Sequence, residues 1–258
     1  MKYEVLLSTM NVNGIAENMK LIKKINTKFD TLTINQITKN NIKMENVDEG
    51  KNRLISVNDK GLSKSRNMAI KNAIGDVVII ADDDLKYKDD FEKIICKEYE
   101  KNKKFDIICF FVESKGERKV KRMPTSKIGK IRAMRICSFQ ITFIKQRIID
   151  KGIKFNENFG AGTYFDRGEE TIFLWECIRK GLKVKFVNKK IADVTHSEST
   201  WFKGYNEEFF VKQGRAFYEL SRKYYKILIL QFVIRKWHLY RKNFNMFKAI
   251  KLMETYCK

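Results

Sequence analysis

The chain has 258 residues, 43% of them hydrophobic, which is enough for one substantial core with an appendage. Its formal net charge of +22 suits a phosphate-bearing substrate or an anionic membrane surface. Because the excess is mostly Lys scattered among Asn and Ile, we expect no nucleic-acid partner. The five cysteines show no CxxC spacing, which argues against a zinc site or a disulfide framework and favours reduced thiols.

The first third of the chain predicts the opening of a parallel α/β sheet. Strands are expected over residues 4–8, 31–34 and 53–57, with a helix over 16–25 after the first strand. Residues 9–14 are predicted to form a polar turn. Strand, helix, strand and strand in this order are typical of a parallel sheet.

Residues 60–73 predict a helix with a basic start. Gly61 permits the turn before it, and Ser63 is the expected N-cap. Lys64 and Arg66 lie in its first turns, near backbone N–H groups that have no helical partner. Together they outline an anion site, although a basic helix start is common by itself.

A β-branched run over residues 77–80 leads into three carboxylates, Asp82, Asp83 and Asp84. An uninterrupted apolar run fits a strand covered on both faces, so the carboxylates are expected just beyond its carboxyl end. Ligands bind there in open α/β sheets. Carboxylate oxygens suit Mg²⁺ or Mn²⁺, which in turn hold phosphates. The triplet alone fits a metal-diphosphate site and a solvated acidic turn equally well.

The middle of the chain continues the alternation of strands and helices. Strands are predicted over 105–112, 138–144 and 182–187, a helix opens at 89–91 and ends near 99, and a short helix covers 146–151. Residues 114–122 predict a charged loop or hairpin, and residues 126–135 form a basic segment whose secondary structure is left open. A Gly-rich loop then precedes Glu169 and Glu170, which open a helix. Glutamates there complement the helix dipole, and such a loop also aims a side chain into a site. His196 follows the last strand and is kept open as a ligand.

Residues 205–258 show no strand alternation, because aromatic and aliphatic residues are interspersed with Lys and Arg. They predict basic helices that either lie in a bilayer interface or pack on the sheet or in an oligomer. The longest apolar run, 227–234, is far shorter than the roughly 20 residues that cross a membrane. With no signal-peptide pattern at the start, we expect a cytoplasmic protein, and contact with the inner face of the cell membrane stays open.

Several blocks, taken in order and spacing, resemble the family 2 glycosyltransferases. The matching residues are 61–63, Arg66-Asn67, Gly75-Asp76, 82–84, 155–157, 168–170 and His196. The resemblance runs from about Tyr3 to Trp201. It implies an α/β fold, with one Rossmann-like A-type glycosyltransferase domain over residues 1–204 and a mostly parallel central sheet. The basic, aromatic-rich helical extension over 205–258 would follow it.

The resemblance also implies roles for individual residues. Asp82 would contact the nucleotide ribose, Asp84 would bind a divalent metal, Mn²⁺ or Mg²⁺, and His196 with Asp82 would complete the metal shell. The donor-binding candidates are Thr9, Asn11, Asn35, Gln36, Asp59, Lys64, Arg66, Asp82 and Asp83. Asn35 and Gln36 stand where the family usually has acidic residues that contact the base.

The predicted catalytic residue is Glu170, which stands where the family usually places an Asp general base. Because Glu is longer than Asp, Glu169 stays open for the same role. The implied reaction moves a sugar, with inversion, from a nucleotide sugar to a hydroxyl of a glycan or lipid-linked acceptor. A UDP-sugar donor and bacterial surface polysaccharide synthesis are favoured, and no oligomeric state is predicted.

Two alternatives stay open at this point. A sugar-phosphate nucleotidyltransferase would normally carry a basic phosphate loop after the first strand, whereas residues 9–14 contain no Lys or Arg. A non-enzymatic basic protein that binds membranes or nucleic acid would use the carboxylates only structurally, and its binding to DNA would depend strongly on salt.

Overall fold

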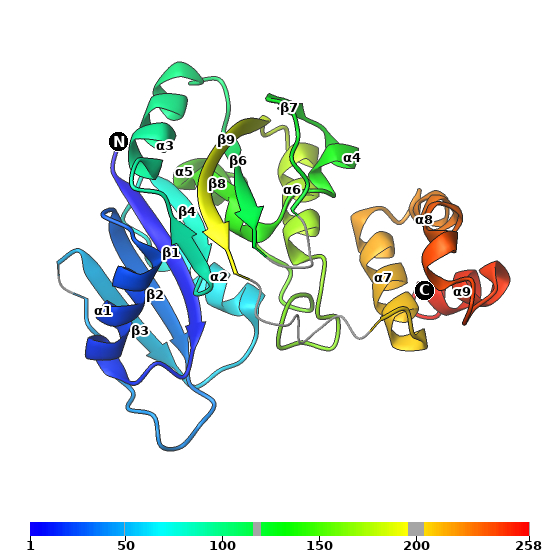
Figure 1. The fold of residues 1–258 in the computed structure, drawn as a ribbon, viewed down its shortest axis with the longest axis horizontal. Helices are drawn as coiled ribbons and strands as arrows, with labels where there is room; N and C mark the ends of the chain where they lie inside the picture. The colour runs from blue at the N-terminus through cyan, green and yellow to red at the C-terminus, as the bar shows by residue number, and fades with distance from the viewer. Residues whose placement is uncertain (49, 116–119, 196–203, 258) are drawn as a thin grey trace.

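The computed structural model describes residues 1–48, 50–115, 120–195 and 204–257. Its central element is a nine-stranded sheet that carries helices on both faces (Figure 1). The strand order is β3-β2-β1-β4-β8-β6-β9-β5, with β7 paired to β9.

Parallel pairing dominates this sheet. One half contains β1 (Tyr3–Met10), β2 (Asp30–Gln36), β3 (Asn52–Val57) and β4 (Val77–Asp82), all parallel to their neighbours. The other half contains β5 (Leu85–Tyr87), β6 (Ile107–Ser114), β7 (Ser126–Ile128), β8 (Ile141–Ile144) and β9 (Val184–Val194). There β6 is parallel to β9, while β5, β7 and β8 are antiparallel to their partners. The predicted mostly parallel α/β sheet is confirmed.

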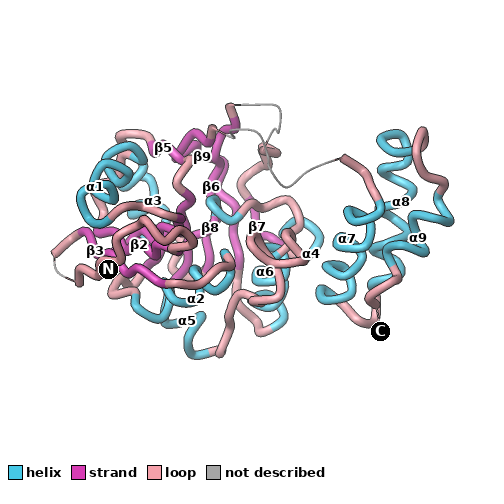
Figure 2. The backbone as a smooth tube through the Cα atoms, turned by 90° about the horizontal axis from the view of Figure 1, so that it is seen from below, coloured by secondary structure: helices cyan, strands magenta, loops and turns pink. Residues whose placement is uncertain are grey.

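Helices cover the sheet on two sides (Figure 2). One face carries α1 (Gly14–Ile25) and α3 (Phe91–Lys101), and the other carries α2 (Leu62–Asn72), α5 (Lys145–Asp150) and α6 (Glu169–Arg179). Short helical turns, α4 (Lys130–Ala133) and the 3₁₀ turn η1 (Ser138–Gln140), connect the later strands.

The β-branched run of β4 shows why both faces are filled. Val77 and Ile79 belong to the hydrophobic cluster under α1 and α3, whereas Val78 and Ile80 belong to the cluster under α2, α5 and α6. All four side chains are fully buried. Because successive strand residues point to opposite faces, an unbroken apolar run is what a doubly covered strand requires.

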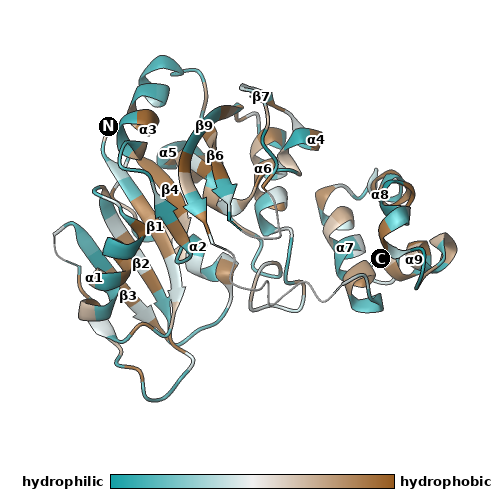
Figure 3. Cartoon of the chain, in the orientation of Figure 1, coloured by the Kyte–Doolittle hydropathy of each residue, from teal (hydrophilic) through white to brown (hydrophobic). Residues whose placement is uncertain are grey.

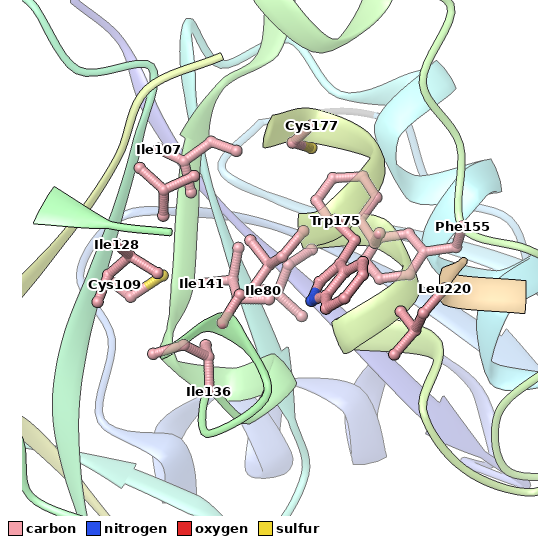
Figure 4. Packing of buried hydrophobic residues seen from close by; sticks show 14 of the residues in the cluster. Ile80, Ile107, Cys109, Ile128, Ile136, Ile141, Phe155, Trp175, Cys177 and Leu220 are labelled. Carbon is pink, nitrogen blue, oxygen red and sulfur yellow. The ribbon is translucent and has the colours of Figure 1, made fainter. Parts of the chain in front are cut away.

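In the described part of the chain, three helices follow the sheet: α7 (Glu207–Leu220), α8 (Tyr225–Tyr240) and α9 (Met246–Met253). They lie at the end of the molecule opposite β3 (Figures 1 and 2). Leu220 of α7 lies beside Phe155 and Trp175 in the core (Figure 4), so α7 is packed directly beside α6. The predicted helical extension is confirmed, and its division from the rest at residue 204 stays a prediction. Within the described residues, no helix is long and apolar enough to cross a bilayer.

Two predicted boundaries near the carboxyl ends of the central strands are wrong. The expected turn over 9–14 begins later, because Thr9 and Met10 still pair with β2. Asp82 was expected beyond β4 but is its last residue and pairs with Ser8 of β1. Pairing with one neighbouring strand, β2 for the end of β1 and β1 for the end of β4, extends these strands past their apolar runs.

Two further predictions fail for local reasons. Ser63 is not the N-cap of α2, because Gly61 takes that position and Ser63 lies in the first turn. The strand expected over 138–144 begins only at Ile141, since the side chain of Gln140 bonds the backbone of Cys137 and Phe110 and holds a 3₁₀ turn instead. Part of the predicted loop over 114–122 lies outside the described residues.

Gly214 in α7 allows α9 to approach backbone to backbone. A Cβ at this position would collide with the carbonyl group of Met253, and backbone cannot move aside as a flexible side chain can. We therefore expect Gly214→Ala to destabilise the protein by about 1–3 kcal/mol, although Ala favours a helix over Gly by about 1 kcal/mol. Urea unfolding measures this change.

Gly129→Ala is the matched control, because a Cβ there would have no heavy atom within 4 Å. Its stability should stay within about 0.5 kcal/mol of the parent protein. A Gly214→Ala variant that is equally stable, or more stable, would contradict the close approach of α7 and α9.

Candidate active site

The candidate site lies at the carboxyl ends of β1 and β4. From β1 the chain proceeds to β2 and β3 on one side, and then returns through α2 to β4 on the other side. Such a reversal leaves a crevice at the carboxyl ends of the two adjacent strands, which is where open α/β sheets bind ligands. Ser8 and Asp82 are register partners at the carboxyl ends of these two strands.

Arg66 of α2 is the central residue of the site. Its side chain is 1% exposed. Its Nη2 lies 3.1 Å from Asp82 Oδ1, at the end of β4, and its Nη1 lies 3.0 Å from Glu169 Oε1, at the start of α6. A buried guanidinium requires opposite charges, and these two carboxylates provide them. The ion pairs therefore fix the acidic end of β4 relative to the acidic start of α6.

The same helix holds the loop that leads to Glu169. Asn67 donates its amide to the carbonyl of Phe155 and to the carboxylate of Glu157, each at 2.9 Å. Ser63 Oγ donates to the carbonyl of Phe159 at 2.6 Å. Residues that match the family pattern in three separate blocks are thus joined by direct hydrogen bonds.

Gly160 is the point where this loop passes closest to α2 and α6. Its φ of +104° belongs to the region that favours glycine. A Cβ there would lie 3.2 Å from Ser63 Oγ and 3.3 Å from Glu169 Cγ. A side chain at this position would therefore push against Ser63, which bonds the loop, and against Glu169, which pairs with Arg66.

The acidic triplet is held by neighbours on both sides. Ser138 Oγ donates to Asp82 Oδ2 at 3.3 Å, and Thr9 Oγ1 donates to Asp83 Oδ2 at 2.8 Å. Burial, followed by the carboxylates of Asp82 and Asp83, raises the pKa of Asp84 to about 6. Three carboxylates crowded at one strand end thus destabilise the charged form of Asp84.

This crowding fits a divalent cation, which would relieve the repulsion. Mg²⁺ is typically bound by one or two carboxylates plus substrate phosphates, and Asp84 with Asp82 matches that donor set. In the described part of the chain, no group of three His, Cys, Asp or Glu side chains forms a metal site by itself. The predicted ligand His196 lies outside the described residues.

The two glutamates that open α6 differ in their environment. Glu169 is 7% exposed and its carboxylate is bound by Arg66. Glu170 is half-buried, and burial together with the Glu169 carboxylate raises its pKa. Glu170 also lies close to this group, because its carboxyl contacts the Glu169 side chain and interacts with the charge of Arg66. Glu170 as the base, with Glu169 open for the same role, stays a prediction.

The predicted base-contacting residues bond to backbone. Asn35 accepts from the N–H of Val12 at 3.0 Å and donates to its carbonyl at 2.7 Å. Gln36 donates to the carbonyl of Gly61 at 3.2 Å. Both amides are buried and hold the loops around the crevice in place.

The remaining donor-binding candidates lie at the rim. Asn11 adopts a left-handed conformation, with φ of 57°, and bonds Thr38. Lys64 Nζ lies 3.0 Å from Asp59 Oδ1, and this hydrogen bond lowers the pKa of Asp59. Both partners are largely exposed.

Some residues of the site could not be predicted from the sequence, because they act through tertiary contacts. Ser138 and Ser65, which bond Asp82 and Ser8 respectively, carry no motif that would single them out. A cavity of about 320 Å³ beside the loop that precedes α6 could not be predicted either. The cavity is lined by Lys60, Gly162, Thr163, Asp166, Arg167, Gly204, Asn206, Glu208, Phe209 and Lys212.

The cavity wall is a network of paired charges. Lys212 of α7, which is 8% exposed, bonds Asp166 at 2.7 Å and Glu208 at 2.6 Å. The guanidinium of Arg167 lies 4.7 Å from the ring centroid of Phe209. The loop before α6 and the first helix of the extension therefore form this wall together.

A doubly covered, mostly parallel sheet with carboxylates at its switch point defines a Rossmann-like α/β protein. Residues 35–166 match the family model described as glycosyl transferase family 2, which is just over half of the chain. The chain belongs to this family. The family that the sequence analysis inferred from residue blocks is thereby confirmed.

Solved structures of S. aureus TarS share the fold. Residues 1–349 of TarS in complex with UDP match with a TM-score of 0.63 and 16% identity, covering 94% of this chain and 74% of that one. The complex with UDP-GlcNAc gives a TM-score of 0.64 at the same identity and coverage. A longer TarS chain is covered over 45% of its length, with a TM-score of 0.63. No curated protein matches the sequence.

The raised pKa of Asp84 predicts a pH-dependent stability. A carboxyl that holds its proton up to about pH 6 when folded, against an ordinary value of 3.8, stabilises the fold below pH 4. That stabilisation is lost as the pH rises through 6, where the folded state must ionise a crowded carboxyl. We expect Asp84→Asn to raise the melting temperature at pH 7.5 and to leave it nearly unchanged at pH 4.

Thermal unfolding without divalent cations, at both pH values, measures this difference. Asp89→Asn is a control, because Asp89 lies outside the triplet in the exposed turn before α3. Equal shifts for Asp84→Asn at pH 4 and pH 7.5 would show that Asp84 ionises normally.

Proposed function

We propose that this protein transfers a sugar from a nucleotide sugar to an acceptor hydroxyl, with inversion at the sugar carbon. The observation that carries the proposal is that buried Arg66 forms ion pairs with both Asp82 and Glu169. They join a carboxylate-rich strand end to the acidic start of α6. Membership of glycosyl transferase family 2 supports a transferase of this kind.

In this proposal the donor occupies the crevice between β1 and β4. Its diphosphate lies at the acidic triplet, with the nucleotide nearest Asp82 and Thr9. A divalent metal held by Asp84 and Asp82 would neutralise charge on the diphosphate as it leaves. A UDP-sugar is favoured, because the TarS structures that share the fold contain UDP and UDP-GlcNAc.

Glu170 acts as the general base. It accepts the proton of the acceptor hydroxyl while that oxygen bonds to the sugar carbon and the bond to the diphosphate breaks. Its raised pKa suits this task, since a base works best when its pKa lies near the working pH. Glu169 is a positioning residue, because its carboxylate is engaged with Arg66.

The acceptor enters from the side of the 320 Å³ cavity, which the loop before α6 and helix α7 line together. Hydrogen-bonding groups such as Thr163 and Asn206, next to the ring of Phe209, suit a sugar unit. We propose a glycan or lipid-linked acceptor and a role in surface polysaccharide synthesis in the cytoplasm.

Glu170→Gln tests the assignment of the base. With a panel of UDP-sugars and Mn²⁺, and with water taking the sugar when no acceptor is added, the parent protein should release UDP and show raised thermal stability with one donor. The variant should keep that thermal shift but lose about 10²–10⁴-fold in UDP release, because only proton transfer is removed. Calorimetry with the same donor checks that its affinity is unchanged.

Glu157→Gln serves as a control at a carboxylate of the same loop, outside the proposed chemistry, and should keep most of its turnover. Full turnover by Glu170→Gln would remove Glu170 from the role of base. Absence of any stabilisation by the whole panel, with and without metal, would count against the nucleotide-sugar reaction itself.

A further inference from the structure

Helix α8 carries an exposed apolar stripe that the fold does not use. Ile227, Leu230 and Ile234 are 63%, 51% and 58% exposed. Their spacing of three and four residues places them on one face of the helix. The opposite face, which includes Leu228, Ile229, Phe232 and Val233, is buried.

The neighbouring helices contact only the buried face of α8. Phe232 packs against Phe209 and Phe217 of α7, and Tyr240 packs against Phe210 of the same helix. The stripe lies on the side away from these contacts. Figure 3 shows the extension, with hydrophobic colouring along α8 and α9, at the end of the molecule away from the sheet.

Two more aromatic side chains extend the apolar surface. Tyr224, just before α8, is 52% exposed, and Phe247, in the first turn of α9, is 86% exposed. Exposed large apolar groups on one small helical unit mark an interaction site more often than single scattered ones do.

The stripe is bordered by cations. Lys223 lies exposed just before α8, Lys226 lies exposed in its first turn, and Arg235 lies exposed beside Ile234. Residues 205–258 contain twelve Lys or Arg against four Asp or Glu. A second copy of the same surface would bring these like charges together, whereas an anionic lipid surface satisfies the apolar stripe and the cations at once.

We propose that α8 and the start of α9 form a docking surface for an anionic lipid bilayer. The side chains of Ile227, Leu230 and Ile234 enter the boundary between headgroups and acyl chains, and Lys223, Lys226 and Arg235 contact the headgroup phosphates. This proposal is independent of the sugar-transfer reaction, because none of these residues lines the crevice or the cavity.

Vesicle flotation of the full chain tests the docking surface. Vesicles of phosphatidylcholine with 30% phosphatidylglycerol should carry the parent protein upward, and pure phosphatidylcholine should carry much less. The triple variant Ile227→Ser, Leu230→Ser, Ile234→Ser should lower the bound fraction at least tenfold. A variant with Lys223→Glu and Lys226→Glu should lower binding to the anionic vesicles and make it less sensitive to salt.

The matched control is Ile131→Ser with Ile149→Ser, two exposed apolar residues of α4 and α5 that are 64% and 47% exposed. It should bind as the parent does, and circular dichroism confirms that each variant is folded. Equal flotation of the parent and the stripe variant, or no flotation of the parent, overturns the proposal. So does a parent dimer in sedimentation equilibrium that the stripe variant abolishes without any lipid binding.

Discussion

The double ion pair of Arg66 is the interaction on which the site depends. Removing a guanidinium from water is costly, and only closely placed carboxylates compensate for it. Asp82 and Glu169 do so from elements that are far apart in the sequence. Asn67, the next residue on α2, clamps the loop that delivers Glu169. One helix therefore sets the distance between the donor side of the crevice and the proposed base, Glu170.

Much of the fold could be predicted because the sequence patterns that indicate its helices and strands are local. The β-branched run before Asp82 identified a doubly covered strand, and helical spacing of apolar residues identified α1, α2 and α3. What failed depended on partners distant in sequence. Thr9 and Met10 are polar or exposed but stay in β1 because they pair with the end of β2. Gln140 delays the start of a predicted strand through its contact with Phe110.

The sequence predicted which residues belong to the candidate site, but not the contacts between them. The order of blocks around Arg66, Asp82 and Glu169 pointed to the family, which the family comparison confirms. That Glu169 binds Arg66 while Glu170 lies against Glu169 could not be deduced, because the sequence does not show which of two adjacent glutamates reaches the guanidinium. The cavity beside α7 could not be predicted either, because Lys212 and Asp166 meet only when α7 packs beside α6 and the loop before it.

A double-mutant cycle on Arg66 and Glu169 tests the central claim most directly. Urea unfolding at pH 7.5 should show that Arg66→Met costs about 3–5 kcal/mol, because it leaves buried carboxylates without their cation. Adding Glu169→Gln should recover part of that loss, with a coupling of about 1–3 kcal/mol. Strictly additive effects would show that Arg66 does not link β4 to α6 and would contradict this account of the site.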